Sequence, residues 1–564
     1  FWGFFAAVLG VYSLIYRQRA LRNAFLFLAS LFFYYKTSGF FFILLIFSTV
    51  ADYLIGFLIH GAKNKARKTT WLVVSITINL LLLSYFKYSY FFTESFNELF
   101  GTNIEYYNHF NAWINGMTDS SFRVDMLLPP VGISFFTFQT ISYAVDVYKG
   151  KIAPVKSILD FGFYVSFFPQ LVAGPIVRAA EFIPQIYKPY RVTYNEFGLS
   201  LFWILKGLLK KMFLADFIAV NFVDRIFAEP QLYTGFENLM GLYGYSLQVY
   251  ADFSGYTDIA IGIALLMGFR LPVNFNYPYK AKSVGEFWKR WHISLSTWLK
   301  DYLYIPLGGS RGSSILTWGF YLSLPIFAIY IFGPIYIPAI IFVSVAVILL
   351  FMYLDFTFEG TRQELATYAN LMVTMLLGGL WHGSTWMFVI WGGLNGVGLV
   401  IYKMWLKPEK PINRFLLILS GLFPVVYLLK YIGKGIDALC KRSGVKPLYF
   451  YTFWSIFLTF NFITFTRIWF RSPDLETADL VMAQIWNNFG WEYIPQVIAN
   501  YAHVFYVMWI GFVMHWTSDS LKERVKHMFI ELPIYVKIGL SVVTVFLIYQ
   551  AMSSDLQPFI YFQF

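Results

Sequence analysis

The sequence predicts an all-α protein that crosses a membrane many times, and its composition and charge distribution both support this. Of its 564 residues, 58% are hydrophobic and 22% aromatic, while only 13% are charged. Soluble domains carry about 25% charged residues. The few charges gather in short clusters between apolar runs of about 20 residues, the length of a helix that crosses a bilayer. This pattern excludes an ordinary water-soluble enzyme.

The net charge of +12 comes from 43 Lys and Arg against 31 Asp and Glu. Basic residues concentrate in the cytoplasmic loops of membrane proteins, so we expect a membrane orientation signal and no nucleic-acid partner. The basic loop at 61–69 is expected in the cytoplasm, and the acidic segment 93–126 outside it. The single cysteine, Cys440, excludes an internal disulfide and a cysteine-rich metal site, and we expect it to be a buried thiol.

The apolar runs predict about 11–13 transmembrane helices, with additional re-entrant and interfacial helices, in a multi-pass protein of the cell membrane. In a cell with two membranes, we expect it in the inner one. We expect a single membrane-embedded domain over residues 1–564. It would consist of N-terminal helices and an outer loop (1–126), a catalytic core (127–403) and C-terminal helices (404–564).

The segment 286–305 is predicted to form one amphipathic helix along the membrane interface. At about 100° per residue, apolar and polar residues fall on opposite sides. The apolar side holds Trp288, Trp291, Leu295, Trp298, Leu299, Tyr302 and Ile305. The polar side holds Lys289, Arg290, Ser296, Thr297, Lys300 and Asp301. The basic residues would meet phosphates, either of lipid headgroups or of a phosphate-bearing donor.

His292 lies at the edge of the apolar side of this segment, so we expect its ring to point inward. A hydrogen-bonded packing residue is the simpler interpretation, and a functional residue is the alternative. Upstream, Asp252 and Asp258 lie in an apolar run, where carboxylates are costly unless they are paired, protonated or beside water. They would form either a proton relay or ties between neighbouring helices.

The run 371–402 is too long for one simple crossing, and it is interrupted by Gly378-Gly379 and by 381–385. We expect the helix to break there, because irregular backbone at membrane depth needs protein or a wet cavity to satisfy its polar groups. His382 is therefore expected to face an internal cavity. A neutral imidazole there is a natural general base near physiological pH.

Four motifs carry a family resemblance: ADFSGYTDIAIG (251–262), LPVNFNYPY (271–279), EFWKRWHISLSTWLKDYLYIPLGG (286–309) and GGLWHGSTW (378–386). With these motifs the chain resembles the membrane-bound O-acyltransferase (MBOAT) superfamily. The match is to its AlgI/DltB branch, and it is closer to the alginate-type polysaccharide O-acetylation proteins. The supporting stretches are 127–148, 167–178 and the terminal 559–564.

The resemblance implies the MBOAT fold, with a funnel from outside and a donor pocket from the cytoplasm that meet at a narrow channel. It implies acyl transfer, with His382 as the catalytic histidine and His292 as the second signature histidine. The residues expected to bind the donor or line the channel are Trp288, Lys289, Arg290, Trp291, Ser294, Trp298, Lys300, Asp301, Tyr302, Trp381 and Ser384. The expected intramembrane polar support consists of Asp252, Ser254, Tyr256, Asp258, Asn274 and Asn276.

The expected reaction moves an acyl group, most simply acetyl, from a cytoplasmic thioester to a hydroxyl reached from outside. The donor would be acetyl-CoA or an acyl-carrier protein, with no bound cofactor and no metal. Expected partners are membrane lipids and an extracytoplasmic acyltransferase or small membrane protein. The alternatives are a transporter or flippase for a polysaccharide or lipid intermediate, with Asp252 and Asp258 as proton relay, and a membrane anchor for a synthase.

Overall fold

The computed structural model describes residues 1–118, 129–171, 174–332, 334–422 and 448–551, with a few single residues between these ranges. Helices and turns make up these ranges, with no strand among them, so the predicted all-α class is confirmed. Cys440 and the terminal motif 559–564 lie outside the described residues. The chain forms two compact units. Unit 1 comprises Phe1–Arg225, Gly244–Asn274 and the chain from Glu492, and unit 2 comprises Ile226–Tyr243 and Phe275–Trp491.

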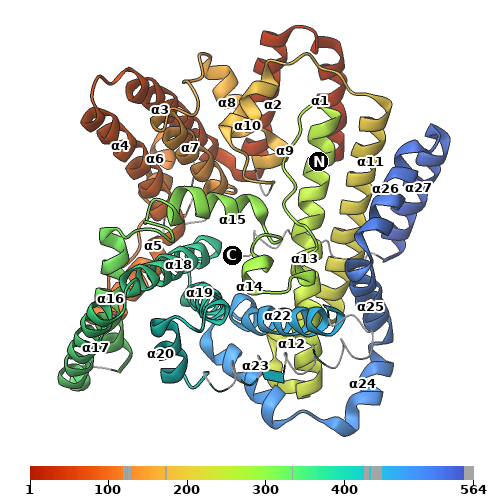
Figure 1. Ribbon diagram of the computed structural model, residues 1–564. Coiled ribbons are helices and arrows are strands. Elements are labelled where there is room, and N and C mark those ends of the chain that lie inside the picture. The colour runs from red at the N-terminus through yellow and green to blue at the C-terminus, as the bar shows by residue number, and fades with distance from the viewer. Residues whose placement is uncertain are drawn as a thin grey trace. The chain divides into compact units, whose positions relative to one another are not determined.

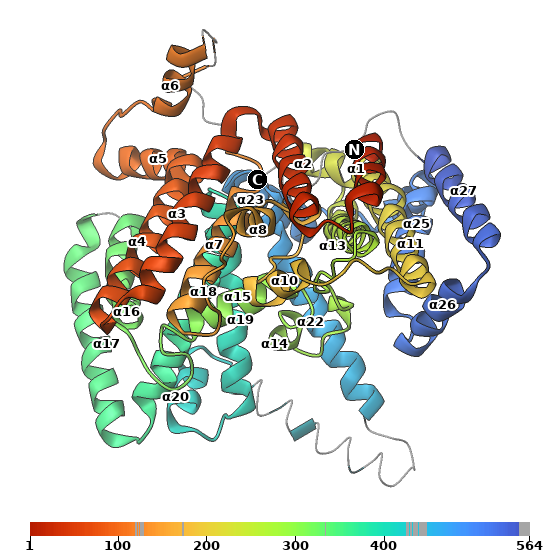
Figure 2. The same cartoon turned by 90° about the horizontal axis from the view of Figure 1, so that it is seen from above.

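Unit 1 contains the N-terminal and C-terminal helices and most of the long helix α13 (Figure 1). Within it, α3 packs against α4 and α7, α2 against α8, and α11 against α26. Figure 2 shows α3 and α4 side by side. Its helices are α1 (Trp2–Ile15), α2 (Arg19–Ser38), α3 (Phe42–Gly61), α4 (Lys65–Leu83), α5 (Ser89–Phe100), α6 (His109–Thr118), α7 (Ile133–Tyr148), α8 (Ile158–Ser166), α9 (Phe168–Leu171), α10 (Ala179–Ile186), α11 (Tyr194–Leu208), α13 (Gly235–Leu266), α24 (Ile494–Asn500), α25 (Ala502–Trp516), α26 (Asp519–Glu531) and α27 (Ile534–Ala551).

A buried carboxylate joins three helices of unit 1. Asp52 on α3 is 1% exposed and accepts hydrogen bonds from Ser75 and Asn79 on α4. The amide oxygen of Asn79 in turn accepts from Thr140 on α7 at 2.8 Å. Buried polar groups stabilise a fold only when they are hydrogen-bonded, and this network meets that requirement between α3, α4 and α7.

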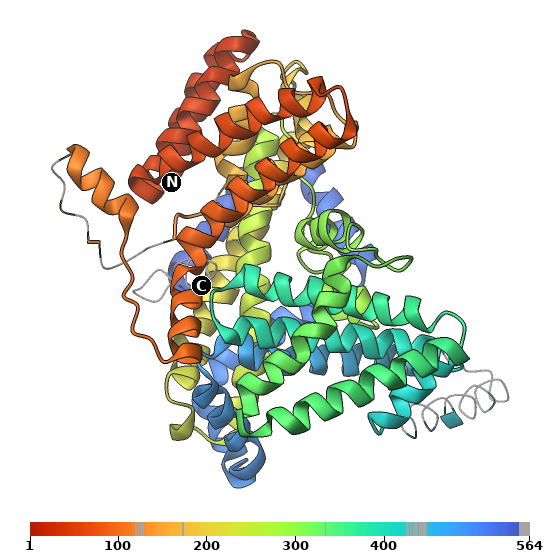
Figure 3. The same cartoon turned by 90° about the vertical axis from the view of Figure 1, so that its left-hand side faces the viewer.

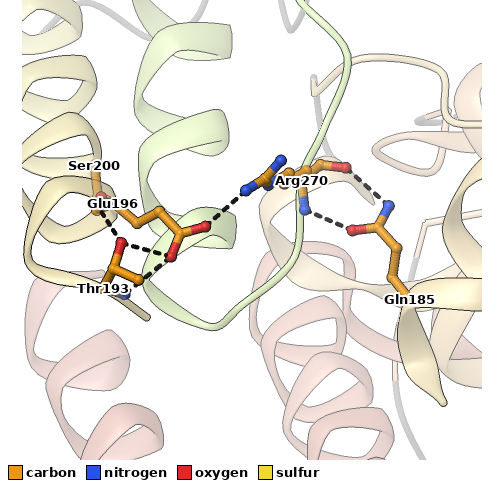
Figure 4. A network of polar contacts seen from close by, with 5 residues as sticks. All are labelled: Gln185, Thr193, Glu196, Ser200 and Arg270. Atoms are coloured by element: carbon orange, nitrogen blue, oxygen red, sulfur yellow. Dashed lines mark hydrogen bonds and ion pairs between the residues drawn. The ribbon is translucent and has the colours of Figure 1, made fainter. Parts of the chain in front are cut away.

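The loop after α13 is held between α10 and α11 by the polar network of Figure 4. The guanidinium of Arg270 lies 2.7 Å from Glu196, and its backbone exchanges hydrogen bonds with the amide of Gln185. Thr193 and Glu196 form a capping box at the start of α11. The backbone N–H of Thr193 and the Arg270 guanidinium lower the pKa of the Glu196 carboxyl, so the network stays charged at neutral pH.

Unit 2 consists mainly of the helices within residues 275–491. α18 packs against α19 along most of its length, α19 packs against α22, and α16 packs against α17 and α18. Figure 3 shows α16–α19 as a stack of green to teal helices. The helices are α14 (Val284–Phe287), α15 (Ile293–Leu299), α16 (Ile315–Phe332), α17 (Ile337–Thr357), α18 (Thr361–His382), α19 (Trp386–Leu406), α20 (Pro411–Leu419), α22 (Leu448–Arg471) and α23 (Leu475–Asn487).

Two glycines let α18 and α19 approach each other closely. A Cβ on Gly379 would lie 2.3 Å from the Phe388 carbonyl oxygen, and a Cβ on Gly392 would lie 2.3 Å from the Met375 carbonyl oxygen. Both obstacles are backbone atoms, which cannot rotate away as a side chain can. The small residues therefore determine how closely the two helices pack, as is usual between helices in membranes.

Five helical segments are long and apolar enough to cross a membrane, or up to seven if each bent pair is one span, within the described residues. They are Arg19–Gly61, Lys65–Phe100, Gly235–Leu266, Ile337–Thr357 and Trp386–Leu406, and the bent pairs lie at Trp491–Trp516 and Asp519–Gln550. Several other expected spans form shorter or interrupted helices, such as α7 and α11. The expected number of 11–13 crossings stays a prediction, while the polytopic all-helical class is confirmed.

We expect Gly392→Ala to lower the stability of the α18–α19 pair by about 1–3 kcal/mol, because the added methyl group would overpack a contact with backbone. Gly393→Ala is the matched control, since its Cβ would meet only the Leu376 side chain at 3.4 Å. Thermal unfolding of both variants in detergent measures the difference. Equal unfolding temperatures for the two variants would contradict the proposed close approach.

Candidate active site

His382 is the last residue of α18, where the chain turns back toward α19. The turn spans Gly383–Thr385, so the predicted break is confirmed there, whereas α18 continues without interruption through Gly378 and Gly379. Gly383 is extended at φ −157°, which any residue adopts, but a Cβ there would lie 2.1 Å from the Phe388 ring. Lack of space, and not backbone strain, therefore requires glycine after the histidine.

His292 lies in a turn, and the prediction of one continuous helix over 286–305 is wrong. The chain forms α14, a turn through 288–292, α15, and a π-helical segment at Lys300–Tyr304. His292 has a φ of 43°, which is uncommon for a residue other than glycine. The turn lets the consecutive side chains of Trp291 and His292 both point inward, with 2% and 0% exposure, whereas a helix would place them about 100° apart.

Hydrogen bonds on both sides hold this turn. The guanidinium of Arg290 pairs with Glu286 at 2.8 Å and donates to the carbonyl of Asn276 at 3.1 Å. The backbone N–H of Asn276 donates to the Arg290 carbonyl at 2.9 Å. Arg290 thus supports the turn beside His292. Backbone conformations of this kind persist where the surroundings stabilise them, and they are common at functional sites.

The two histidines face each other inside unit 2. Their ring centroids are 6.3 Å apart and the ring planes are inclined by 70°. His382 is 2% exposed and its ring contacts those of Trp391 at 5.0 Å and Phe470 at 5.5 Å. The ring of Trp381 lies 5.8 Å from that of His292. The two imidazoles are therefore close together and surrounded by aromatic rings.

Burial also fixes the charge of His292. Loss of solvation lowers its pKa to about 3, against about 6.5 for an exposed histidine. Its imidazole is therefore neutral at physiological pH. A neutral imidazole can donate a hydrogen bond from one nitrogen and accept at the other, which suits it to orient a substrate or relay a proton.

The expected separation of polar and apolar residues over 286–305 is present in part even though the single helix is not, since Ile305 of the expected apolar side is 51% exposed. Lys289 and Lys300 are exposed, whereas Trp298 is 6% exposed. Trp298 stacks on Tyr302 at 5.3 Å, and Trp288 contacts the ring of Trp391 at 5.7 Å. Of the other expected donor or channel residues, the side chains of Ser294 and Trp381 are buried, and those of Asp301 and Ser384 are partly buried.

Most of the expected intramembrane polar residues belong to unit 1, whereas the two histidines belong to unit 2. Those in unit 1 are Asp252, Ser254, Tyr256, Asp258 and Asn274, whereas Asn276 belongs to unit 2. Asp252 pairs with Lys211, and Asp258 pairs with Lys206 at 3.1 Å and Lys210 at 2.8 Å. These ion pairs tie α13 to α11 and its π-helical continuation at Leu209–Asp216, which agrees with the helix-tie alternative for the two carboxylates.

The sequence analysis missed four residues beside the histidines. Trp391 and Phe470 contact His382, Phe275 lies 6.4 Å from His292, and the guanidinium carbon of Arg467 lies 4.4 Å from the Trp291 ring centroid. The sequence did contain an indication of Arg467, because a charged residue is unusual within an apolar run such as 448–470. The aromatic residues gave no such signal in a chain so rich in aromatics.

Comparison with known proteins places this chain in a family. A sequence profile of the membrane-bound O-acyltransferase family matches residues 153–324. The chain is 36% identical over 427 residues to the probable alginate O-acetylase AlgI of Pseudomonas aeruginosa, covering 74% of this chain and 69% of that protein. It is 32% identical over 479 residues to the peptidoglycan O-acetyltransferase of Helicobacter pylori, covering 80% of this chain and 71% of that protein.

A more distant relative is the teichoic acid D-alanyltransferase of Streptococcus thermophilus, which is 28% identical over 293 residues, or 51% of this chain and 60% of that protein. By class, the chain is therefore an all-helical membrane protein whose relatives are acyl-transfer enzymes. The chain belongs to the membrane-bound O-acyltransferase family, and it is an O-acyltransferase.

We expect His292→Gln to lower turnover by up to about 10²-fold through loss of substrate orientation. The shape of the kcat profile between about pH 5 and pH 8 should not change, because the buried His292 stays neutral throughout this range. Steady-state kinetics of both proteins across this range provide the test. Loss of an acidic limb in the variant would show that His292 titrates and is charged during turnover.

Proposed function

We propose that the protein transfers an acetyl group from a cytoplasmic thioester to a hydroxyl, in the O-acylation of a cell-envelope or exported polysaccharide. The observation that carries the proposal is the pair of buried imidazoles, 6.3 Å apart, in a chain whose relatives include an alginate O-acetylase and a peptidoglycan O-acetyltransferase. Both named activities modify a hydroxyl of a glycan. This supports a polysaccharide as the final acceptor.

His382 acts as the general base in this proposal. It removes the proton of the acceptor hydroxyl as that oxygen attacks the thioester carbonyl carbon, and it later returns the proton to the departing sulfur. General-base catalysis of this kind contributes about 10²–10⁴-fold. The aromatic rings of Trp391 and Phe470 around His382 keep bulk water from the reacting atoms, which limits hydrolysis of the thioester.

His292 orients the reactive thioester beside His382. Its turn is supported by Arg290 and its ring is wholly buried, so its position relative to His382 is well defined. Correct placement of reacting groups is one of the largest contributions to enzymatic rates. The exposed Lys289 and Lys300 would attract the phosphates of acetyl-CoA or of an acyl-carrier protein.

The transported acyl group needs an acceptor on the other side of the membrane. We propose that a residue of an extracytoplasmic acyltransferase, or a small membrane partner, receives it and passes it to the polymer. The protein would act in the cell membrane, or in the inner membrane of a cell that has two. The alternative of a transporter depended on Asp252 and Asp258 as a proton relay, and their pairing with lysines does not favour it.

We expect His382→Ala to lower acetyl transfer by about 10²–10⁴-fold while the protein remains inserted and folded. His60→Ala is the control, because His60 is exposed at the end of α3. Transfer of radiolabelled acetyl from acetyl-CoA, or from an acetylated carrier protein, to acceptor measures the effect in nanodiscs. Wild-type transfer by purified His382→Ala would refute the catalytic assignment, and polymer transport that persists without transfer would support the transporter alternative.

We expect charge reversal of both lysines, Lys289→Glu with Lys300→Glu, to raise the KM for the donor about tenfold or more, with little change of kcat at saturating donor. Loss of charge-assisted contacts to phosphate weakens ground-state binding and leaves proton transfer intact. Kinetics with donor varied decide this. An unchanged KM for the donor would exclude a carrier-facing role for the two lysines.

A further inference from the structure

Arg467 is a buried cation on the last turns of α22. It is 1% exposed and is among the largest fully buried side chains. Within the part of the chain that the structure describes, none of its three side-chain nitrogens has a hydrogen-bond partner, and no carboxylate forms an ion pair with it. Removing a guanidinium from water without pairing it is strongly unfavourable, so natural proteins rarely do so without a functional reason.

Two aromatic rings lie against this cation. Its guanidinium carbon lies 4.4 Å from the ring centroid of Trp291 and 5.3 Å from that of Phe470. Cation–π attraction to two rings replaces only a small part of the lost hydration. The folded protein therefore retains a positive charge in this region that an anion would stabilise.

The same aromatic rings connect Arg467 to both histidines. Phe470 lies 5.5 Å from the ring of His382, and Trp291 directly precedes His292 in the turn. The cation is thus one ring away from His382, and it packs on the residue that directly precedes His292. Arg467 is therefore positioned to act on charge that forms between the two histidines.

A second donor lies in the same aromatic cluster. The indole N–H of Trp288 is buried and has no hydrogen-bond partner in the described residues. Trp288 packs on Trp391, which contacts His382. Guanidinium and indole groups donate hydrogen bonds and do not accept them, so the ligand that satisfies both must carry acceptor atoms, as a negatively charged oxygen does.

We propose that Arg467 binds the negatively charged oxygen of the acyl group during transfer, and that it binds small carboxylates of the same shape, such as acetate. The proposal rests on the acyl transfer proposed above. The acceptor oxygen forms a bond to the thioester carbon, the carbonyl π electrons move onto its oxygen, and His382 takes the hydroxyl proton. When the carbonyl re-forms, the carbon–sulfur bond breaks, the sulfur leaves with the bonding electrons and His382 returns the proton to it.

Arg467 stabilises the oxygen while it carries the charge in this step. Fixed positive charge in a site that excludes water is effective for this purpose, and removal of one such group costs about 10²–10³-fold in kcat. The positive charge that is unfavourable in the empty protein is then favourable in the transition state.

Arg467→Met and Arg467→Lys test the proposal by thermal unfolding in detergent, with sodium acetate or sodium chloride at equal ionic strength, and by kinetics. Acetate should raise the unfolding temperature of the wild type and have no effect on that of Arg467→Met.

Without acetate, Arg467→Met should unfold at the wild-type temperature or above it, because an uncompensated buried charge is gone. Its kcat should fall by about 10²–10³-fold with less change in the KM for the donor, and Arg467→Lys should retain part of both functions.

Lys537→Met is the matched control. Lys537 is a buried cation in unit 1 that stacks on Tyr194 but also donates to the carbonyl of Ile530 at 2.8 Å. Its removal should lower the unfolding temperature and leave the acetate response intact.

Three results would overturn the assignment. The first is a wild type whose unfolding temperature does not rise with acetate, and the second is an Arg467→Met variant whose unfolding temperature still rises. The third is an Arg467→Met variant that is less stable than the wild type but has normal turnover. The last result would make Arg467 a structural clamp. If the wild type transfers no acetyl group, the proposed function fails, while the acetate response still decides whether Arg467 binds an anion.

Discussion

The close approach of α18 and α19 is the constraint on which the site in unit 2 depends. Gly379 and Gly392 bring the two backbones together, and Gly383 leaves room for the Phe388 ring directly after His382. α18 must end at His382 because the chain reverses direction there to form α19, which packs back against α18. The position, burial and neighbours of the His382 imidazole are therefore consequences of helix packing, and they do not require a specialised loop.

Polar groups in this protein are satisfied in two different ways. In unit 1, Asp52 is hydrogen-bonded by Ser75 and Asn79, and Asp258 is paired with Lys206 and Lys210. These networks stabilise the fold, because buried charges and amides need partners. In unit 2, Arg467 is buried against aromatic rings only, in the described part of the chain. This difference separates the polar residues that hold helices together from the one that we propose to bind the acyl oxygen.

The aromatic composition has a physical role at the histidines. Trp391 and Phe470 surround His382, and Trp381 lies beside both imidazoles. Aromatic side chains bury large apolar areas with few rotatable bonds, so they exclude water and define the positions of their neighbours. Of these rings, Phe470 also contacts the Arg467 guanidinium, as does Trp291, and a purely aliphatic lining would not stabilise this cation at all.

The sequence by itself determined the helical membrane class, the helix break after His382 and the choice of both histidines as candidates. Each follows from a local property: apolar length, a glycine-rich interruption, or a motif of adjacent residues. Only the tertiary structure decided that 286–305 is two short helices around a turn, since the periodicity of that segment is equally compatible with one helix. The deciding factor is packing, because burial of both Trp291 and His292 outweighs the cost of a left-handed backbone at residue 292. The place of Arg467 beside this turn was likewise undetermined, because Arg467 and Trp291 are 176 positions apart along the chain and meet only through the packing of α22. No local sequence pattern indicates such a contact.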